Sequence, residues 1–220
     1  MAEGVLLDND IVLKTCAYRC HREMIARTTS GGVTPGMLAI GRFTLRSRFK
    51  RSRILADAAG SALAFEELLA AIRLVDPSER EIQLAAEIEE RAAALSLEFD
   101  TGESQLLAVL LVRGEKLLIT GDKRAVHALY EVGMVGAEGR IACLEQLVAS
   151  VLAHCGAAAL RNRVCAEPEV DKALTACFAC FASSVEAENV LAGLRSYSRH
   201  LRNRTGALLL SSDDLSAIVA

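Results

Sequence analysis

Short apolar runs that end in an acidic residue are the feature that most constrains the fold of this chain. Three such runs are of strand length, namely 5–7 before Asp8, 95–99 before Asp100 and 117–120 before Asp122. Each is followed by a segment with apolar residues three or four positions apart, which is typical of a helix. Strands that alternate with helices favour a parallel sheet covered by helices. We therefore expect a three-layer α/β/α fold.

The alternating pattern extends to about residue 140. It includes a further strand at 37–40, a mostly helical segment at 57–75 and a helix that begins with Asp76 as its N-cap. Beyond residue 140 the sequence becomes mostly helix-like, with segments at 141–155, 170–181 and 186–202 and a strand-like run only at 207–210. We predict an α/β domain over residues 1–140 and a mostly helical extension over residues 141–220.

The composition supports a folded chain with a large apolar core. Hydrophobic residues make up 52% of the 220 residues, while Trp is absent, so the core must consist of Leu, Ala, Val and Ile. The beginning of the chain is acidic and lacks the pattern of a secretory signal. No apolar run reaches the roughly 18 residues of a membrane span. We expect a cytoplasmic protein with no membrane partner, whose seven cysteines are reduced thiols.

The acidic residues after the strands predict a metal site. The carboxyl ends of parallel strands lie along one edge of a sheet, where ligands usually bind. Several carboxylates at such an edge repel one another unless a cation or a proton neutralises them. Oxygen ligands favour Mg²⁺ or Mn²⁺. Asp8, Asp100, Glu103 and Asp122 are therefore expected to converge around one of these cations.

Basic residues are concentrated in one segment that contains no acid. These residues are Arg42, Arg46, Arg48, Lys50, Arg51 and Arg53, and a second basic pair, Lys123 and Arg124, directly follows Asp122. Phe43 and Phe49 lie among the first group, and aromatic rings between cations can stack on bases. A nucleic acid, with RNA as the first choice, is the predicted partner, and a solvated helix face is the alternative interpretation of residues 42–53.

Three motifs in this order resemble those of the PIN domain. They are Leu-Leu-Asp-Asn-Asp at 6–10, Asp-Thr-Gly-Glu at 100–103 and Thr-Gly-Asp at 120–122, and the resemblance covers roughly residues 5–130. It implies a central parallel sheet flanked by helices. It also implies a Mg²⁺- or Mn²⁺-dependent nuclease, in many members the ribonuclease of a bacterial toxin–antitoxin pair. An antitoxin-like protein partner and a homodimer are further expectations from this resemblance.

The resemblance assigns a role to individual residues. Asp8 matches the first acid of the family, and Asp122 matches the last, with Thr120 as its polar companion. The third position falls on Asp100 and Glu103. For the second acid the candidates are Glu66 and Glu67, although they lie farther along the chain than is usual in the family. Asp10 stands where many members have Asn or Ser, so it either adds a metal ligand or caps the first helix.

Two other functions fit parts of the same pattern. The Asp-x-Asp arrangement of Asp8 and Asp10 resembles the start of haloacid-dehalogenase-like phosphatases, in which Asp8 would be the covalent nucleophile and Asp10 the general acid. That interpretation leaves Asp100 and Glu103 unexplained. Alternatively, the fold could serve as a nucleic-acid or protein binding module with weak catalysis, and the helical extension fits a binding role.

Overall fold

A five-stranded parallel sheet lies at the centre of the computed structural model, which describes residues 3–213 and 215. The strand order is β3-β2-β1-β4-β5, and the strands are β1 Val5–Leu7, β2 Gly36–Leu38, β3 Arg73–Val75, β4 Leu117–Thr120 and β5 Ile141–Cys143. The central strand β1 pairs Leu6 with Gly36 on one side and with Leu118 on the other. Because every pairing is parallel, the carboxyl ends of all five strands lie at one edge.

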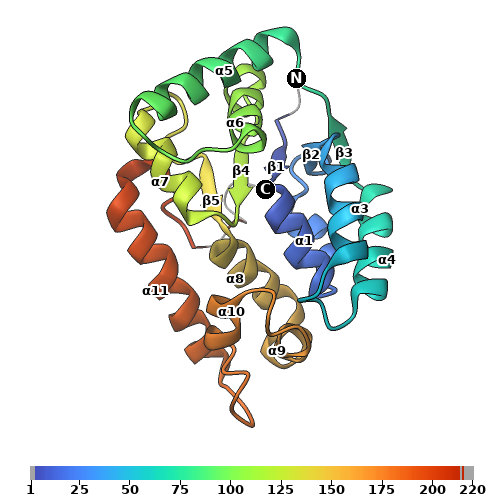
Figure 1. Cartoon of the computed structure of the whole chain (residues 1–220). Coiled ribbons are helices and arrows are strands. Elements are labelled where there is room, and N and C mark those ends of the chain that lie inside the picture. The colour runs from blue at the N-terminus through green and yellow to red at the C-terminus, as the bar shows by residue number, and fades with distance from the viewer. Residues whose placement is uncertain (1–2, 214, 216–220) are drawn as a thin grey trace.

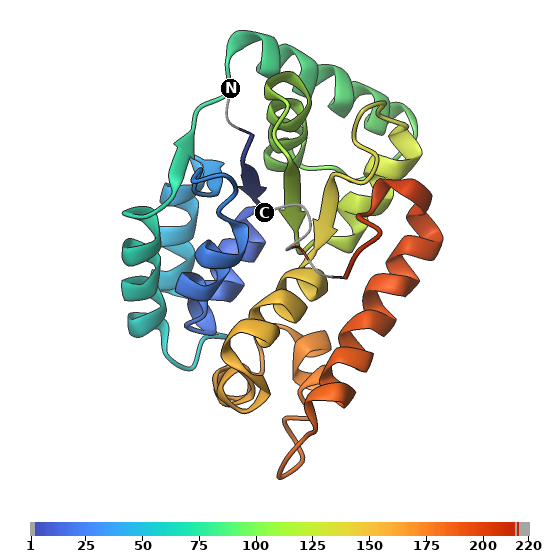
Figure 2. The ribbon, with the colours of Figure 1, turned by 180° about the vertical axis from the view of Figure 1, so that it is seen from behind.

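Helices cover both faces of this sheet (Figures 1 and 2). One face carries α1 Asn9–Ala17, α2 His21–Thr28, α3 Gly41–Arg51 and α4 Ala58–Leu69, and the other carries α5 Glu79–Ala94, α6 Thr101–Arg113 and α7 Lys123–Val132. Successive side chains of a strand point to opposite faces. Val5 and Leu7 accordingly belong to one apolar cluster, and Leu6 belongs to the other. The predicted three-layer α/β/α architecture is confirmed.

The segment after residue 140 is mostly helical, as expected, but it also completes the sheet. Its elements after β5 are α8 Leu144–Cys155, α9 Ala157–Ala166, α10 Lys172–Cys177, α11 Ala187–Thr205 and a short 3-10 helix, Gly206–Leu208. Leu147 and Val151 of α8 are buried in the same apolar cluster as Leu7 of β1. The boundary predicted at residue 140 therefore falls immediately before a strand of the central sheet. In the described part of the chain, no helix combines the length and apolar character that crossing a bilayer requires.

The strand predicted over residues 95–99 is wrong. This segment is a loop between α5 and α6, with Ser96 at a φ of 56° and Leu95 half exposed. The segment is not part of the sheet, and Phe99 is partly buried against the second apolar cluster. Alternation alone cannot distinguish burial against helices from burial in a sheet.

Four other predicted elements also differ from the structure. The helix predicted over 57–75 ends at Leu69, and its last residues form the edge strand β3. Residues 141–143, predicted as helix, form β5, while the strand-like run at 207–210 contributes a single bridge, from Leu209 to Ile141. Helix α5 begins after Ser78, not Asp76, because the Ser78 hydroxyl and the Glu81 carboxylate form a capping box.

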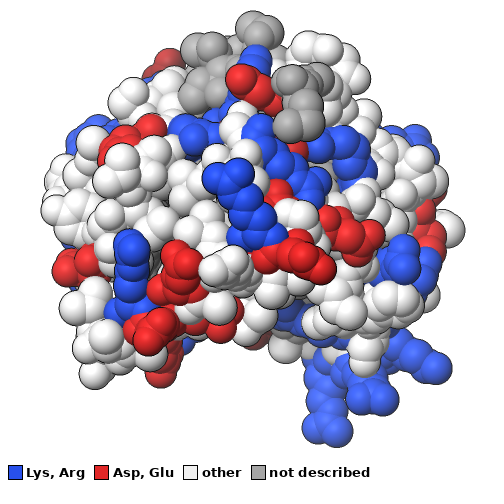
Figure 3. All heavy atoms as spheres, turned by 90° about the horizontal axis from the view of Figure 1, so that it is seen from above, with Lys and Arg blue, Asp and Glu red and all other residues white. Residues whose placement is uncertain are grey.

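The amino-terminal edge of the sheet is closed by ion pairs and hydrogen bonds. Glu115 is buried, and its carboxylate accepts hydrogen bonds from the backbone of Gly4 (2.6 Å) and from the Arg73 guanidinium (2.9 Å). Arg140 donates to the carbonyl of Leu110 (2.9 Å). On the face that is seen from above, acidic and basic side chains are neighbours across the middle, whereas a group of basic side chains projects alone at the lower right (Figure 3). At this edge, buried charges are therefore paired.

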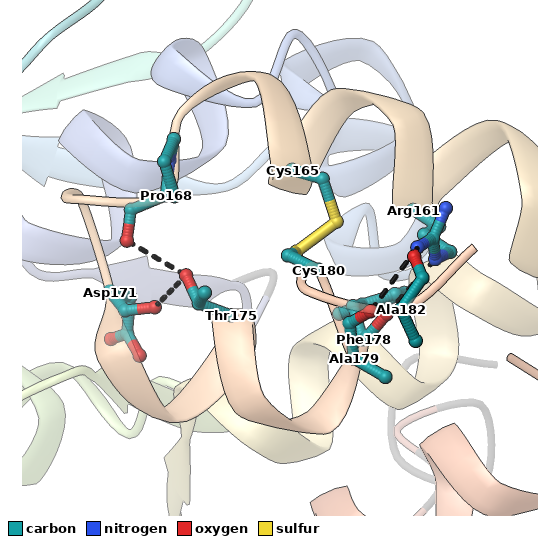
Figure 4. Close-up of a disulfide and its surroundings, with 9 residues drawn as sticks. All are labelled: Arg161, Cys165, Pro168, Asp171, Thr175, Phe178, Ala179, Cys180 and Ala182. Atoms are coloured by element: carbon teal, nitrogen blue, oxygen red, sulfur yellow. Dashed lines mark hydrogen bonds between the residues drawn. A yellow bond between two sulfur atoms is a disulfide. The ribbon is translucent and has the colours of Figure 1, made fainter. Parts of the chain in front are cut away.

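A disulfide joins Cys165, in α9, to Cys180, just beyond α10 (Figure 4). The Cα atoms are 5.2 Å apart, and the Arg161 side chain ties the same turn by donating to the carbonyl of Phe178 (3.1 Å). The expectation that all thiols are reduced is therefore wrong for this pair. The spacing of the cysteines carries no such signal, because the α9–α10 turn is what brings them together. The other five cysteines are free, and four of them are buried.

Candidate active site

Asp8 and Asp122 are held at the carboxyl ends of the two central strands, β1 and β4. The backbone N–H of Asp8 donates to the carbonyl of Ile119 (3.0 Å), so Asp8 continues the parallel ladder before it caps α1. Asp122 caps α7, and its Oδ1 accepts the N–H of Arg124 (2.8 Å). Buried Thr120 links the two acids, because its hydroxyl donates to Asp8 Oδ2 (3.3 Å) and accepts the N–H of Asp122 (3.1 Å).

Asp100 and Glu103 reach the same edge from the start of α6, after a loop and not after a strand. They form a capping box in which Asp100 Oδ1 accepts the N–H of Glu103 (2.9 Å) and Glu103 Oε2 accepts the N–H of Asp100 (3.3 Å). This exchange fixes both carboxylates within one helical turn. The motif at 100–103 therefore reaches the same edge as Asp8 and Asp122, although the strand predicted before it is absent.

These acids line one pocket, which we call the acidic pocket. Its volume is about 490 Å³. Its lining residues come from α1, α3, α6 and the β4–α7 junction and are Asp8, Asn9, Asp10, Lys14, Thr44, Arg48, Asp100, Gly102, Glu103, Gly121 and Asp122. The structure thus brings together every predicted acid except the two glutamates of α4. Sequence reasoning missed Asn9, Lys14, Thr44, Gly102 and Gly121.

Crowding and burial shift the proton affinities of these acids. Burial, followed by the charges of Asp10 and Asp100, raises the pKa of Asp8 to about 6. Burial also raises the pKa of Glu103 to about 8, and the charges of Asp100, Asp8 and Asp122 add to the rise. These are the shifts expected when carboxylates share a site with too little positive charge. Carboxyl groups with such shifts, in a concave site, are typical of functional sites.

Asp122 behaves differently, because an arginine partly neutralises it. Burial disfavours its ionised form, but hydrogen bonds from Arg124 outweigh that effect and lower the pKa of Asp122. The Arg124 Nη2 atom lies 3.0 Å from Asp122 Oδ2, and its side chain is largely exposed. Exchange of this contact for another cation would need only rotation of an exposed side chain.

Asp10 lies at the rim of the acidic pocket and is engaged by Lys14. The Lys14 ammonium is 2.7 Å from Asp10 and 2.7 Å from Asp171, the N-cap of α10, so it bridges the two acids. Gly121 has no side chain where a Cβ would collide with the Asp10 carboxylate. Asp10 is therefore positioned as a structural ion pair at the pocket rim, while Asp8 points at Thr120.

Glu66 and Glu67 lie away from the acidic pocket. Both are exposed on the outer side of α4. Glu66 pairs with Arg46 of α3 (2.7 Å), and Glu67 pairs with Arg22 of α2 (2.7 Å). Hydrogen bonds from these arginines lower the pKa of both carboxyl groups. The structure therefore does not bring these two predicted ligands to the other acids, because residues 66 and 67 face away from the core that holds α4 against α1.

The basic residues of α3 do not act as one patch. Arg48 lines the acidic pocket, and with Arg51 it lines a shallow groove of about 280 Å³ beside that pocket. Arg46 is held by Glu66. Arg42 covers the ring of exposed Phe43 at 4.7 Å. Lys50 and Arg53 are exposed without lining either cavity, and Phe49 is buried, so stacking on Phe49 is excluded.

Lys123 and Arg124 begin α7 directly after Asp122 and are not among the residues that line the acidic pocket. Lys123 pairs at 2.5 Å with the buried carboxylate of Glu145. Besides its contact with Asp122, Arg124 approaches Glu98 at 3.5 Å.

The carboxylates are gathered but are not arranged around an ion as they stand. Within residues 3–213 and 215, no group of three or more His, Cys, Asp or Glu side chains could hold a metal ion in its present conformation. Glu103 Oε2 accepts the N–H of Asp100 (3.3 Å), and Asp122 Oδ2 lies 3.0 Å from Arg124, so one oxygen of each carboxylate already has a partner. The donor set itself is all oxygen, which fits a hard divalent cation.

We compared this chain with protein families, curated proteins and solved structures. No family model, no curated protein and no solved structure matches this chain. The resemblance to the PIN domain therefore depends on the three motifs and on the residues that they bring to the acidic pocket.

Proposed function

We propose that this chain is a PIN-like, metal-dependent nuclease that hydrolyses phosphodiester bonds of RNA as an endoribonuclease. The observation that carries the proposal is the convergence of Asp8, Asp100, Glu103 and Asp122 in one pocket. Burial and mutual repulsion there raise the pKa of Asp8 to about 6 and that of Glu103 to about 8, which agrees with this geometry. Carboxylates that repel one another in the folded state gain most from a divalent cation, which removes the repulsion.

In this proposal Asp8, Asp100, Glu103 and Asp122 hold Mg²⁺ or Mn²⁺. A bound cation of this kind lowers the pKa of water and neutralises charge that develops on the phosphate. Thr120 positions Asp8 and Asp122 through its two hydrogen bonds. Arg48, at the pocket wall, is placed to contact a phosphate of the substrate, and Arg124 would leave Asp122 for the same purpose.

The first experiment measures RNA cleavage and metal binding on the same variants. We expect a fluorescein-labelled RNA of mixed sequence to be cut in the presence of Mn²⁺ and not in EDTA. Asp8→Asn and Asp122→Asn should each reduce the rate by about 100-fold or more, the size typical for loss of a preorganised electrostatic group. Calorimetry should show that Mn²⁺ binding weakens in parallel.

Glu67→Gln is the matched control, because Glu67 is an acid outside the acidic pocket. It should leave cleavage and Mn²⁺ binding unchanged. Cleavage that survives in Asp8→Asn and Asp122→Asn alike would contradict the proposal and indicate a contaminating nuclease. Circular dichroism of each variant would verify that the fold is intact.

The phosphatase alternative makes a different prediction at Asp8. If Asp8 were a covalent nucleophile, a phosphoryl analogue would be trapped on it, and small phosphomonoesters would be hydrolysed. The place of Asp100 and Glu103 in the acidic pocket favours the nuclease, because the phosphatase interpretation gives them no role. RNA binding without turnover in any divalent metal would instead support a binding module. The cytoplasmic location, an antitoxin-like partner and a homodimer stay predictions.

A further inference from the structure

A second pocket, of about 420 Å³, lies between α7, α11 and the loop that precedes α6. We call it the basic–aromatic pocket, because Lys123, Arg124, His127, Tyr197, His200 and Arg204 line it. We propose that it binds one nucleotide of a single-stranded RNA, next to the phosphodiester that is cut. This proposal rests on the proposed function for its choice of RNA, but its test measures binding and not cleavage.

The basic–aromatic pocket and the acidic pocket are connected by a third depression that shares lining residues with both. A shallow depression of about 430 Å³ between them is lined by Glu98 and Arg124, which also line the basic–aromatic pocket. The same depression is lined by Asp100, Glu103 and Asp122, which also line the acidic pocket. A strand with a phosphate at the acids can therefore continue along this depression, and its neighbouring nucleotide would reach the basic–aromatic pocket.

The lining of the pocket matches the two parts of a nucleotide. Arg124 and Arg204 provide permanent positive charge for a phosphate, against the single acid Glu98. Tyr197 is 38% exposed, and the Lys123 ammonium lies over one face of its ring, 4.5 Å from the ring centre. Lys123 is itself fixed by buried Glu145, so the ring and the ammonium form a preorganised pair. A base that stacks on an aromatic ring beside cations is the usual mode of single-strand binding.

The size and shape of the pocket favour a single strand over a duplex. A cavity of about 420 Å³ is within the range of small-ligand sites, and it can enclose a base that has left its stack. In a duplex the bases stay paired and present mainly backbone to a protein. The proposal also assigns a binding role to the segment after residue 140, because Tyr197, His200 and Arg204 belong to α11.

The test is binding of a fluorescein-labelled single-stranded RNA of ten mixed nucleotides, followed by fluorescence anisotropy in EDTA so that no metal-dependent cleavage occurs. Tyr197→Ala should weaken binding by about tenfold, the order of magnitude of one lost stacking contact. Tyr197→Phe keeps the ring and should bind within about twofold of the unchanged protein. Tyr130→Ala is the matched control, because Tyr130 is exposed on α7 but does not line the pocket.

The proposal is overturned if the unchanged protein does not bind the RNA, if Tyr197→Ala binds as well as the unchanged protein, or if Tyr130→Ala loses as much affinity. It is also overturned if a blunt duplex of the same length binds as tightly as the single strand. The thermal unfolding of each variant verifies that loss of affinity is not loss of fold.

Failure of this pocket and failure of the proposed function can be told apart. Metal-dependent cleavage with an unchanged KM in Tyr197→Ala would reject the pocket and leave the nuclease. Binding that depends on Tyr197, without cleavage in Mn²⁺ or Mg²⁺, would support the pocket and reject the nuclease.

Discussion

Glu81 and Glu103 occupy the same position of the same local motif in two helices that pack against each other. Each is the third residue of its helix and closes a capping box, with Ser78 at the start of α5 and with Asp100 at the start of α6. Both side chains are buried, with exposed fractions of 1% and 9%. Local sequence and burial are therefore matched, and only the tertiary surroundings differ.

Those surroundings shift the two carboxyl groups in opposite directions. The Arg113 guanidinium donates to both oxygens of Glu81 at 2.7 Å and lowers the pKa of Glu81 to about 2. Burial and the charges of Asp100, Asp8 and Asp122 instead raise the pKa of Glu103 to about 8. In the described part of the chain, no salt bridge reaches Glu103.

The two glutamates lie at opposite edges of the sheet, Glu81 near the amino ends of the strands and Glu103 near their carboxyl ends. Arg113 is the last residue of α6, and Glu103 stands in the first turn of the same helix. At the end near Arg113, which is also the edge of Glu115 and Arg73, buried acids are paired with arginine. At the other end, Glu103 faces the charges of Asp100, Asp8 and Asp122. A buried acid that is paired with arginine has a structural role, whereas an acid whose pKa is raised by its acidic neighbours is neutralised by a proton or by a bound cation. Groups of the second kind are typical of functional sites.

Of the substitutions that test this comparison, Glu81→Gln should change the free energy of unfolding most. Glu81→Gln keeps the cap but removes the charge that faces Arg113, so it should lower the free energy of unfolding at pH 7 by about 3 kcal/mol. Because the pKa of Glu81 is lowered in the folded state, its contribution is present above pH 4.5 and is lost as pH falls through about 2. Urea unfolding at pH 7 and at pH 2.5 measures both parts of the prediction.

The control for this variant is Glu79→Gln, which removes an exposed acid from the first turn of the same helix. It should have little effect at either pH. If Glu79→Gln and Glu81→Gln were equally destabilised, the helix dipole and not Arg113 would be the source of the stabilisation.

Neutralising Glu103 should have the opposite sign. The pKa of Glu103 is raised from 4.5 to about 8 in the folded state, so the folded protein loses stability as pH rises between these values. Glu103→Gln should therefore raise the free energy of unfolding at pH 8 by about 1 to 2 kcal/mol, a modest gain because the pocket is open to water, and should have no effect at pH 4. Unfolding in urea at the two pH values measures it.

The same unfolding experiment, repeated with Mn²⁺, tests whether a cation binds beside Glu103. A bound cation removes the repulsion that Glu103→Gln relieves, so Mn²⁺ should stabilise the unchanged protein at pH 8 more than the variant. Destabilisation by Glu103→Gln at pH 8 without metal would show that Glu103 is held by its cap and not strained by its neighbours, and the comparison with Glu81 would fail.

The part of the candidate site that could be predicted from the sequence depends on local structure. Asp8 and Asp122 follow strands and cap the next helices, and both properties can be recognised within a few residues of each acid. The parallel topology then brings them together without further information. The motif at 100–103 also identifies a capping box, which is a local signal.

What the sequence could not reveal depends on which surfaces meet. Strands β3 and β5 have three residues each, too few to show a period, and each was hidden in a longer helical pattern. The partners of Glu66 and Glu67 lie on α3 and α2, so their diversion from the pocket follows from helix packing alone. The place of Arg48 beside the acids and the disulfide between Cys165 and Cys180 have the same origin.

The smallest expected effect on stability and cleavage is that of Glu66→Gln. Glu66 lies on α4, away from both Glu81 and Glu103. Its carboxylate forms two hydrogen bonds with Arg46, at 2.8 and 2.7 Å, but both side chains are about half exposed. Exposed ion pairs of this kind contribute little, because water and salt screen them and because two long side chains must be held in place. Glu66→Gln should therefore leave the melting temperature unchanged and alter RNA cleavage by no more than about twofold.

Glu66→Gln tests whether Glu66 is a metal ligand in addition to the four acids of the acidic pocket. If the site is complete with Asp8, Asp100, Glu103 and Asp122, Glu66→Gln and the matched variant Glu67→Gln will behave alike in cleavage and in Mn²⁺ binding. A loss of Mn²⁺ affinity in Glu66→Gln alone would mean that α4 moves toward the acidic pocket when the ion binds. Because Arg46 holds Glu66 on the outer face of α3 and α4, such a movement would have to break that pair first, and Arg46→Gln should then strengthen Mn²⁺ binding.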